Sequence, residues 1–328
     1  MTGILNSYGT VGSYLLVVVS VGLLFYGAEW LVHGGSQIAR RFGIKPLVVG
    51  LTIVAFGTSM PEFVVSFFAA MQGSSTIAIG NIIGSNITNI GLILGLSTLI
   101  FPIIVSFRTV YLQLLIMIAV TVLLYVFALN GVISRWQGIL MVILLIGYVY
   151  YLYNNPSQAE IEEIELTSEN FIRSIAMVIF GIVALTVGAR LFVDSAIWLA
   201  QYYHVPEVVI GLTIVALGTS LPELATSMVA AFRKHSEISL GNIVGSNIFN
   251  ILFIMGGVSV IKPLYVFEKR VAADGSITQY FPHFEYLFML GISVALLVLA
   301  LRNRIGRLAG FVFLGCYVYF YVYLYQHM

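Results

Sequence analysis

A long internal repeat constrains the fold of this chain more than any other feature of its sequence. Residues 47–90 align without a gap on residues 208–251 at a constant offset of 161, and 26 of the 44 aligned positions are identical. Both copies lie in apolar sequence. Self-similarity at a fixed spacing indicates that one structural unit is used twice.

Composition places both units in a membrane. Of the 328 residues, 60% are hydrophobic and only 9% are charged, whereas soluble domains carry roughly a quarter charged residues. Apolar runs of about 20 residues predict transmembrane helices, and a transmembrane barrel would show short alternating strands instead. We predict an all-α polytopic membrane protein with ten transmembrane helices. The predicted spans are 13–39, 46–72, 76–103, 108–130, 135–153, 171–200, 206–232, 237–261, 285–301 and 307–325.

Other whole-chain features narrow the expected partners. The formal net charge of +1 gives no electrostatic basis for nucleic-acid binding. The single cysteine, Cys316, excludes an intramolecular disulfide, and the first apolar run is too long for a cleaved signal peptide. We expect the lipid bilayer to be the main partner, with no organic cofactor and no obligatory protein partner.

The polar segment 154–170 divides the chain into a first five-helix repeat, 1–153, and a second, 171–328. Because each repeat has an odd number of spans, the second must enter the membrane from the opposite side. Inverted repeats of this kind are typical of secondary transporters, whose binding sites lie near the midplane at discontinuous helices.

The basic residues predict the orientation, because Lys and Arg concentrate in cytoplasmic loops. With both termini extracellular and the acidic linker cytoplasmic, ten basic residues are cytoplasmic and four are external. The cytoplasmic set is Arg40, Arg41, Lys45, Arg108, Arg173, Arg233, Lys234, Arg302, Arg304 and Arg307. The external set is Arg135, Lys262, Lys269 and Arg270.

Each repeat carries a helix breaker beside an acidic residue, in "AFGTSMPEF" (55–63) and "ALGTSLPEL" (216–224). Proline removes a backbone donor and clashes with the preceding turn, so we expect the helix to end near Gly57 and to restart near Pro61. The carbonyl groups of residues 55–58 would then be free as ligands. Glu62 would lie in the first turn of the new helix, where the helix dipole favours a carboxylate. Helices 2 and 7 are therefore predicted to be broken.

The segment after each break places polar side chains on one helix face. In "GNIIGSNITNI" (80–90), Asn81, Ser85 and Asn89 are spaced by four residues, and the second repeat has the same spacing in "GNIVGSNIFNI" (241–251). The glycines allow a second helix to approach closely. The oxygen-bearing side chains of both repeats are Thr58, Ser59, Glu62, Ser85, Asn89, Thr219, Ser220, Glu223, Ser246 and Asn250.

This donor set suits a hard cation. Ca²⁺ prefers carboxylate and carbonyl oxygen, whereas zinc and copper sites use His and Cys. Two glutamates supply a charge of −2, which Ca²⁺, Na⁺ ions or two protons could neutralise. A bent helix with two neutral buried glutamates and packing asparagines is the structural alternative. Glu29 and Arg190 occupy equivalent positions in the repeats. An ion pair between them is one hypothesis, but symmetry does not itself bring them into contact, and we expect both residues to lie near the membrane interface.

The paired motifs, within residues 50–91 and 211–252, resemble those of the cation/calcium antiporter superfamily, and specifically prokaryotic sodium/calcium exchangers. "GTSMPE" with "GNIIGSNITN", followed by "GTSLPE" with "GNIVGSNIFN", carries the resemblance. It implies ten helices, ion sites enclosed by the two broken helices and their partners, and long first and sixth helices that slide to alternate access.

The resemblance also implies roles for individual residues. Glu62 and Glu223 would coordinate calcium. Thr58 and Thr219 would give backbone oxygens to the same ion. The family's sodium sites map onto Ser59, Ser85, Ser220, Ser246 and the carbonyl groups of Ala55 and Ala216. The remaining mid-site positions map onto Asn89 and Asn250. Some relatives have Asp where this chain has Asn250, so the site here has one potential charge fewer.

These inferences predict a secondary antiporter in a prokaryotic plasma membrane that exchanges Ca²⁺ for Na⁺ by alternating access. A proton/calcium antiporter with the same glutamates is the main alternative, and a passive cation channel is a further one. An intramembrane enzyme is disfavoured because the sequence shows no His cluster, nucleophile–base pair or metal triad.

Overall fold

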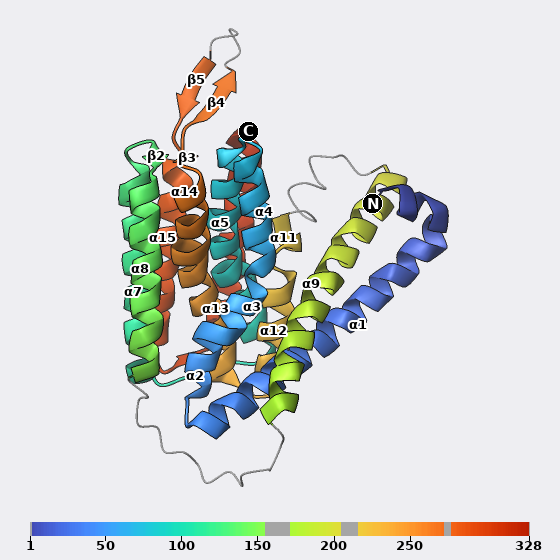
Figure 1. The fold of residues 1–328 in the computed structure, drawn as a ribbon, viewed down its shortest axis with the longest axis vertical. Helices are drawn as coiled ribbons and strands as arrows, with labels where there is room; N and C mark the ends of the chain where they lie inside the picture. Colours follow the sequence, from blue (N-terminus) through green and yellow to red (C-terminus); the bar gives the residue numbers. More distant parts are fainter. Residues whose placement is uncertain (1, 155–170, 205–215, 272–276, 328) are drawn as a thin grey trace.

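The computed structural model describes residues 2–154, 171–204, 216–271 and 277–327, and these are almost entirely helical (Figure 1). The helices of the first half are α1 (Thr2–Phe42), α2 (Pro46–Val49), η1 (Gly50–Val54), α3 (Ala55–Thr58), α4 (Met60–Met71), α5 (Ser75–Thr88), η2 (Asn89–Leu94), α6 (Gly95–Ile100), α7 (Phe107–Ala128) and α8 (Arg135–Asn154). Those of the second half are α9 (Phe171–Tyr202), α11 (Ala216–Gly218), α12 (Leu221–Phe232), α13 (Ser236–Phe249), η4 (Asn250–Met255), α14 (Gly256–Ile261), α15 (His283–Ala300) and α16 (Arg307–His327).

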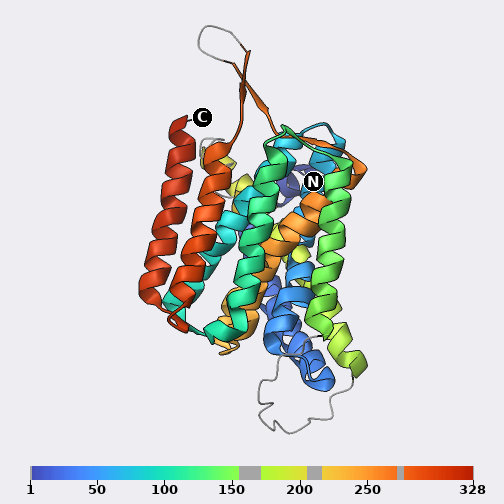
Figure 2. The same ribbon diagram turned by 90° about the vertical axis from the view of Figure 1, so that its left-hand side faces the viewer.

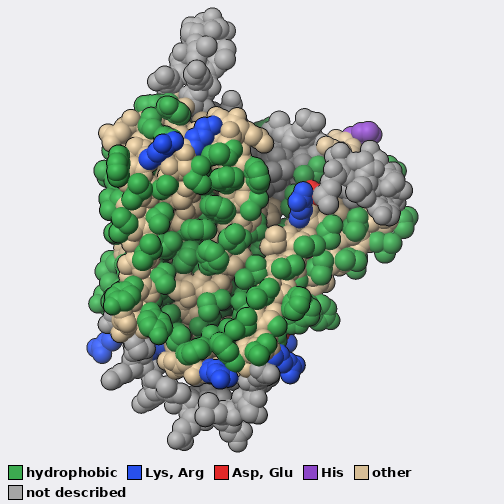
Figure 3. All heavy atoms as spheres, viewed as in Figure 1, with side chains coloured by type: hydrophobic (Ala, Val, Ile, Leu, Met, Phe, Trp, Pro, Cys, Tyr) green, Lys and Arg blue, Asp and Glu red, His purple; other side chains and the backbone are tan. Residues whose placement is uncertain are grey.

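The lengths and hydropathy of these helices confirm a polytopic helical membrane protein. Among the described residues, eight helices are long and apolar enough to cross a membrane, and the bent pair Pro46–Thr58 and Met60–Met71 makes a ninth. The predicted span 206–232 falls partly on 205–215, outside the described ranges, and its described part forms α11 and α12. Apolar side chains cover the middle of the face in Figure 3, and most of the Lys and Arg visible there lie toward its ends.

Helices α1 and α9 form a long pair beside the main bundle (Figure 1). Glycine makes their close contact possible: a Cβ added at Gly181 would lie 2.8 Å from the carbonyl oxygen of Gly27 and 2.8 Å from the amide nitrogen of Leu31. The pair meets the bundle mainly where α1 packs on α12. The first and sixth predicted spans therefore associate mostly with each other.

Close helix packing also joins the two repeats. A Cβ at Gly241 would lie 2.7 Å from the carbonyl oxygen of Leu47, and one at Gly50 would lie 2.7 Å from that of Ile238. This packing of α13 on α2 and η1 is the close approach that the glycines predict for the second repeat. The segment of the second repeat that is equivalent to α2 and η1 lies at 207–215, outside the described residues.

Three short antiparallel strand pairs, which the sequence analysis did not predict, lie outside the helices. Strands β1 (Ile103–Ile104) and β6 (Arg304–Ile305) pair, as do β2 (Val132–Ile133) and β3 (Leu264–Tyr265). Strands β4 (Glu268–Val271) and β5 (Ile277–Tyr280) form a hairpin that projects beyond the helix ends (Figure 2). The first two pairs tie helix ends of one half to those of the other.

Candidate cation-binding site

The two helix breaks place a glutamate in the first turn of a new helix. Helix α3 ends at Thr58 and α4 starts at Met60, with a bend of 44° between the two helical segments. In the second repeat, α12 starts at Leu221, directly after Ser220. Glu62 is 0% exposed and Glu223 is 1% exposed. The break is therefore shorter than predicted, but the glutamate lies at the predicted helix start.

Each glutamate is hydrogen-bonded by a serine of the other repeat. Ser59 donates from Oγ to Glu223 Oε1 at 3.1 Å, and Ser220 donates from Oγ to Glu62 Oε1 at 3.2 Å. These bonds bring the two breaks together although they are far apart in sequence. The other carboxylate oxygen of each glutamate, Oε2, is buried and has no hydrogen-bond partner in the described part of the chain. Burying an unpaired carboxylate oxygen is costly, and a bound cation or proton would remove that cost.

A second set of bonds crosses between the repeats in the same way. Asn81 donates from Nδ2 to Ser66 Oγ at 2.9 Å and to the carbonyl oxygen of Glu62 at 3.3 Å, and its Oδ1 accepts from Thr219 Oγ1 at 3.4 Å. In the other repeat, Asn242 makes the matching bonds to Ser227, Glu223 and Thr58. Because both ends of each amide are used, Asn81 and Asn242 brace the breaks.

The remaining predicted site residues lie on the partner helices or on the break itself. Ser220 Oγ also lies 3.4 Å from Ser85 Oγ, and Ser246 Oγ is buried without a partner among the described residues. The expectation of a free Ala55 carbonyl is wrong: that oxygen accepts the Ser59 amide at 3.0 Å, because one helical bond survives at the bend. Ala216 starts α11.

Asn89 and Asn250 are the first residues of the π-helical segments η2 and η4 and are fully buried. Each donates to an asparagine of the other repeat: Asn89 Nδ2 to Asn247 Oδ1 at 3.1 Å, and Asn250 Nδ2 to Asn86 Oδ1 at 2.9 Å. The sequence analysis missed Asn86 and Asn247. Their identity at the fixed offset of 161 was the available signal.

The chemistry of the site is that of oxygen ligands. Within the described ranges, no three His, Cys, Asp or Glu side chains come together in a way that could hold a metal. The two carboxylates are instead surrounded by hydroxyl, amide and backbone oxygens. Hard cations prefer such donors, and soft metals do not.

Glu29 lies outside this site, and its ion-pair partner is not Arg190. Its Oε1 accepts from Nε of Arg233, at the end of α12, at 2.7 Å, in place of the Arg190 partner that repeat symmetry suggested. Symmetry equates two positions without bringing them into contact. The hydrogen bond and the charge of Glu29 raise the pKa of the Arg233 guanidinium above its ordinary value.

Two broken helices that carry buried carboxylates toward each other within a membrane bundle define a secondary transporter. A family model confirms the class: the chain belongs to the sodium/calcium exchanger protein family, whose model matches residues 12–154 and 173–326. It is therefore a transporter of the sodium/calcium exchanger type and not an enzyme. The two matched stretches fall one in each predicted half.

Individual relatives agree with this assignment. The chain is 32% identical to the sodium/calcium exchanger MaX1 of Methanosarcina acetivorans, with 95% of this chain and 98% of that protein covered. It is 34% identical to the inner membrane protein YrbG of Escherichia coli, covering 94% and 96%. Among solved structures, it resembles the sodium-calcium exchanger NCX_Mj soaked with 2.5 mM Na⁺ and 0.1 mM Ca²⁺, with a TM-score of 0.79, 35% identity and coverage of 94% and 96%.

Proposed function

We propose that this chain exchanges Ca²⁺ for Na⁺ across the plasma membrane by alternating access, with the ions bound between Glu62 and Glu223. The reciprocal Ser–Glu bonds carry this proposal. They hold one oxygen of each carboxylate and leave the other oxygen buried and unpaired. A divalent cation between the two groups neutralises their charge of −2, and Na⁺ ions can replace it at the same oxygens.

The remaining ligands would complete the shell around the ions. We assign them to hydroxyl, amide and backbone oxygens of Ala55, Thr58, Ser59, Ser85, Asn89, Ala216, Thr219, Ser220, Ser246 and Asn250. The Ala55 carbonyl oxygen accepts the Ser59 amide but has a second lone pair for an ion. For Thr58 and Thr219 we assign the backbone oxygens, and their hydroxyl groups donate to Asn242 and Asn81 and so help to hold the two breaks together. Exchange of three Na⁺ for one Ca²⁺ would move one net charge, worth about 2.3 kcal/mol per 100 mV.

The packing of α1 and α9 supports alternating access. The two helices contact each other far more extensively than they contact the bundle, so they can move as a unit over the site. NCX_Mj, which is similar over nearly the whole chain, was studied for extracellular ion exchange and induced occlusion of its binding site. We propose the same cycle here, with both termini extracellular and the 154–170 linker cytoplasmic.

The test is ⁴⁵Ca²⁺ uptake into proteoliposomes that contain the purified protein. Vesicles loaded with Na⁺ and diluted into Na⁺-free medium at constant pH should accumulate Ca²⁺, and collapsing the Na⁺ gradient should stop uptake. Uptake driven only by a pH gradient would change the coupling ion to H⁺. Flux that only follows the Ca²⁺ gradient would refute exchange and favour a channel.

A further inference from the structure

Four buried asparagines form two hydrogen-bonded pairs across the repeats, beside the proposed cation site. Asn250 pairs with Asn86 and Asn89 pairs with Asn247, at 2.9 and 3.1 Å between the amide nitrogen and the amide oxygen. All four side chains are at most 2% exposed. Asn86 and Asn247, which occupy the same position in the motifs 80–90 and 241–251, are the acceptors.

The surroundings of Asn86 fix the direction of this bond. Its Nδ2 lies 3.5 Å from the carbonyl oxygen of Asn247 and 3.5 Å from the sulfur of Met289. Both neighbours can only accept hydrogen bonds, so the nitrogen of Asn86 faces them and its Oδ1 faces Asn250. Asn250 must then donate its Nδ2. Its own Oδ1 is turned away, buried and without a partner among the described residues.

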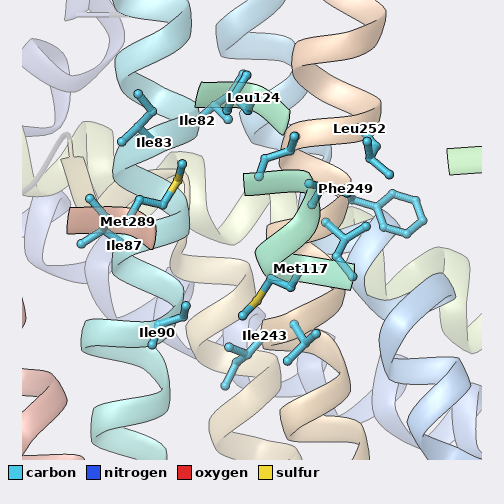
Figure 4. Packing of buried hydrophobic residues seen from close by; sticks show 14 of the residues in the cluster. Ile82, Ile83, Ile87, Ile90, Met117, Leu124, Ile243, Phe249, Leu252 and Met289 are labelled. Atoms are coloured by element: carbon cyan, nitrogen blue, oxygen red, sulfur yellow. The ribbon is translucent and has the colours of Figure 1, made fainter. Parts of the chain in front are cut away.

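The other pair repeats this arrangement with a different helix. Asn247 Nδ2 lies 3.5 Å from the sulfur of Met117 on α7, and its Oδ1 accepts from Asn89. The Oδ1 of Asn89 is likewise buried and has no partner in the described structure. Figure 4 shows Met117 and Met289 among the buried side chains of the core. Each sulfur therefore sets the orientation of one asparagine, which in turn sets that of the next.

We propose that Asn86 and Asn247 are positioning residues, which hold the amide groups of Asn250 and Asn89 with their oxygens toward the bound cation. This role rests on the proposed function, because it assumes a cation site between Glu62 and Glu223. Without Asn86, the amide of Asn250 can turn its Nδ2 toward the site and bond an unpaired oxygen there. A cation must then displace that bond before it binds.

The expected effect follows from this competition. A ligand that binds only a minor conformer loses apparent affinity in proportion to the population of that conformer. A hydrogen bond to a charged group is strong enough to make the turned amide dominant, so Asn86→Leu should weaken Ca²⁺ binding about tenfold. Asp at position 250 has two oxygens and presents one in either orientation. In an Asn250→Asp background, Asn86→Leu should therefore weaken binding less than about twofold.

The experiment is equilibrium ⁴⁵Ca²⁺ binding to the full chain in detergent, for Asn86→Leu with and without Asn250→Asp. A large loss in the parent and a small loss in the Asp background is the expected result. Equal losses in both backgrounds would mean that Asn86 only packs, and would overturn the proposal. Gln113→Leu removes another buried amide, on α7 outside the site, and should leave binding within about twofold in both backgrounds.

The mirror pair provides a second measurement if Asn86→Leu does not fold. Asn247→Leu should weaken binding, and Asn89→Asp should restore it. Equal losses with and without Asn89→Asp would again overturn the proposal. A parent protein that binds ⁴⁵Ca²⁺ but shows no Na⁺-driven exchange would refute the proposed transport cycle and leave the positioning test intact. A parent that binds no Ca²⁺ would overturn both.

Discussion

Replacement of Glu62 by glutamine is the most direct perturbation of the proposed site. Glutamine keeps the shape of the side chain, and its amide oxygen can still accept the bond from Ser220, which is 3.2 Å long in the structure. The change removes one negative charge and replaces the unpaired Oε2 by an NH₂ group. The fold should survive, because the contacts of the buried side chain are kept. The effect should therefore fall on ion binding.

The size of the effect depends on the charge of the ion. Two unit charges about 4 Å apart interact by about 4 kcal/mol at an effective dielectric constant of about 20. Ca²⁺ doubles that attraction, but the desolvation cost of the carboxylate is also removed. We expect a net loss of about 4 kcal/mol for Ca²⁺, a factor of about 1,000 in affinity. For Na⁺ the attraction is half as large while the same desolvation cost is removed, so the two nearly cancel and the loss in affinity should be less than about tenfold.

Two assays check this reasoning on one preparation. Equilibrium binding of ⁴⁵Ca²⁺ and ²²Na⁺ to the purified protein gives the two losses separately, and Na⁺-driven ⁴⁵Ca²⁺ uptake into proteoliposomes should be abolished. Glu237→Gln, in the first turn of α13, is the matched control and should keep both binding and uptake. A Glu62→Gln protein that retains uptake, or loses less than about tenfold in Ca²⁺ affinity, would refute a site built on this carboxylate.

Three further predictions concern other parts of the molecule. Asn250→Asp should make Na⁺-driven uptake dependent on pH, because it adds a titratable group to the site, and a pH profile unchanged from the parent would contradict this. Gly50→Ala would place a Cβ 2.7 Å from the carbonyl oxygen of Ile238 and should cost about 1–3 kcal/mol of stability. This loss of stability should lower the melting temperature in detergent. The control Gly22→Ala, where a Cβ meets nothing within 4 Å, should not lower it. Equal melting temperatures for the two variants would refute the packing argument. Arg233→Gln breaks an exposed ion pair and should leave the melting temperature within about 2 °C, so a large drop would mean that the pair holds α1 against the bundle.

The residues of the site can be predicted from the sequence more readily than the hydrogen bonds between them. Proline next to a glutamate in an apolar span is a local signal, and the structure places Glu62 and Glu223 at helix starts as expected. The spacing of Asn81, Ser85 and Asn89 on one face follows from helix geometry alone. By contrast, the sequence could not show that Asn81 uses both ends of its amide for bracing. Its type and spacing are equally suitable for a ligand.

The structure does not bear out two ideas from the sequence, a Glu29–Arg190 ion pair and a free carbonyl group at Ala55, and both fail for the same reason. The repeat equates Glu29 with Arg190, yet Glu29 bonds to Arg233 because α1 packs on α12. A break at proline predicted a free carbonyl at Ala55, but the bend leaves its helical bond to Ser59 intact. Local chemistry indicates what a residue can do. Its actual partner depends on which helices pack together.

The sequence by itself determined that this is a helical membrane protein built from two repeats, with one buried acid at each helix break. Those properties depend on hydropathy, spacing and backbone chemistry, which act over a few residues or a few turns. Only the tertiary structure decided that Ser59 serves Glu223, that Ser220 serves Glu62, and which oxygens remain unpaired. The partners in these bonds are 164 and 158 residues apart. Such contacts depend on how the two halves interlock, because each hydroxyl or amide can bond only with what the packed helices bring within reach.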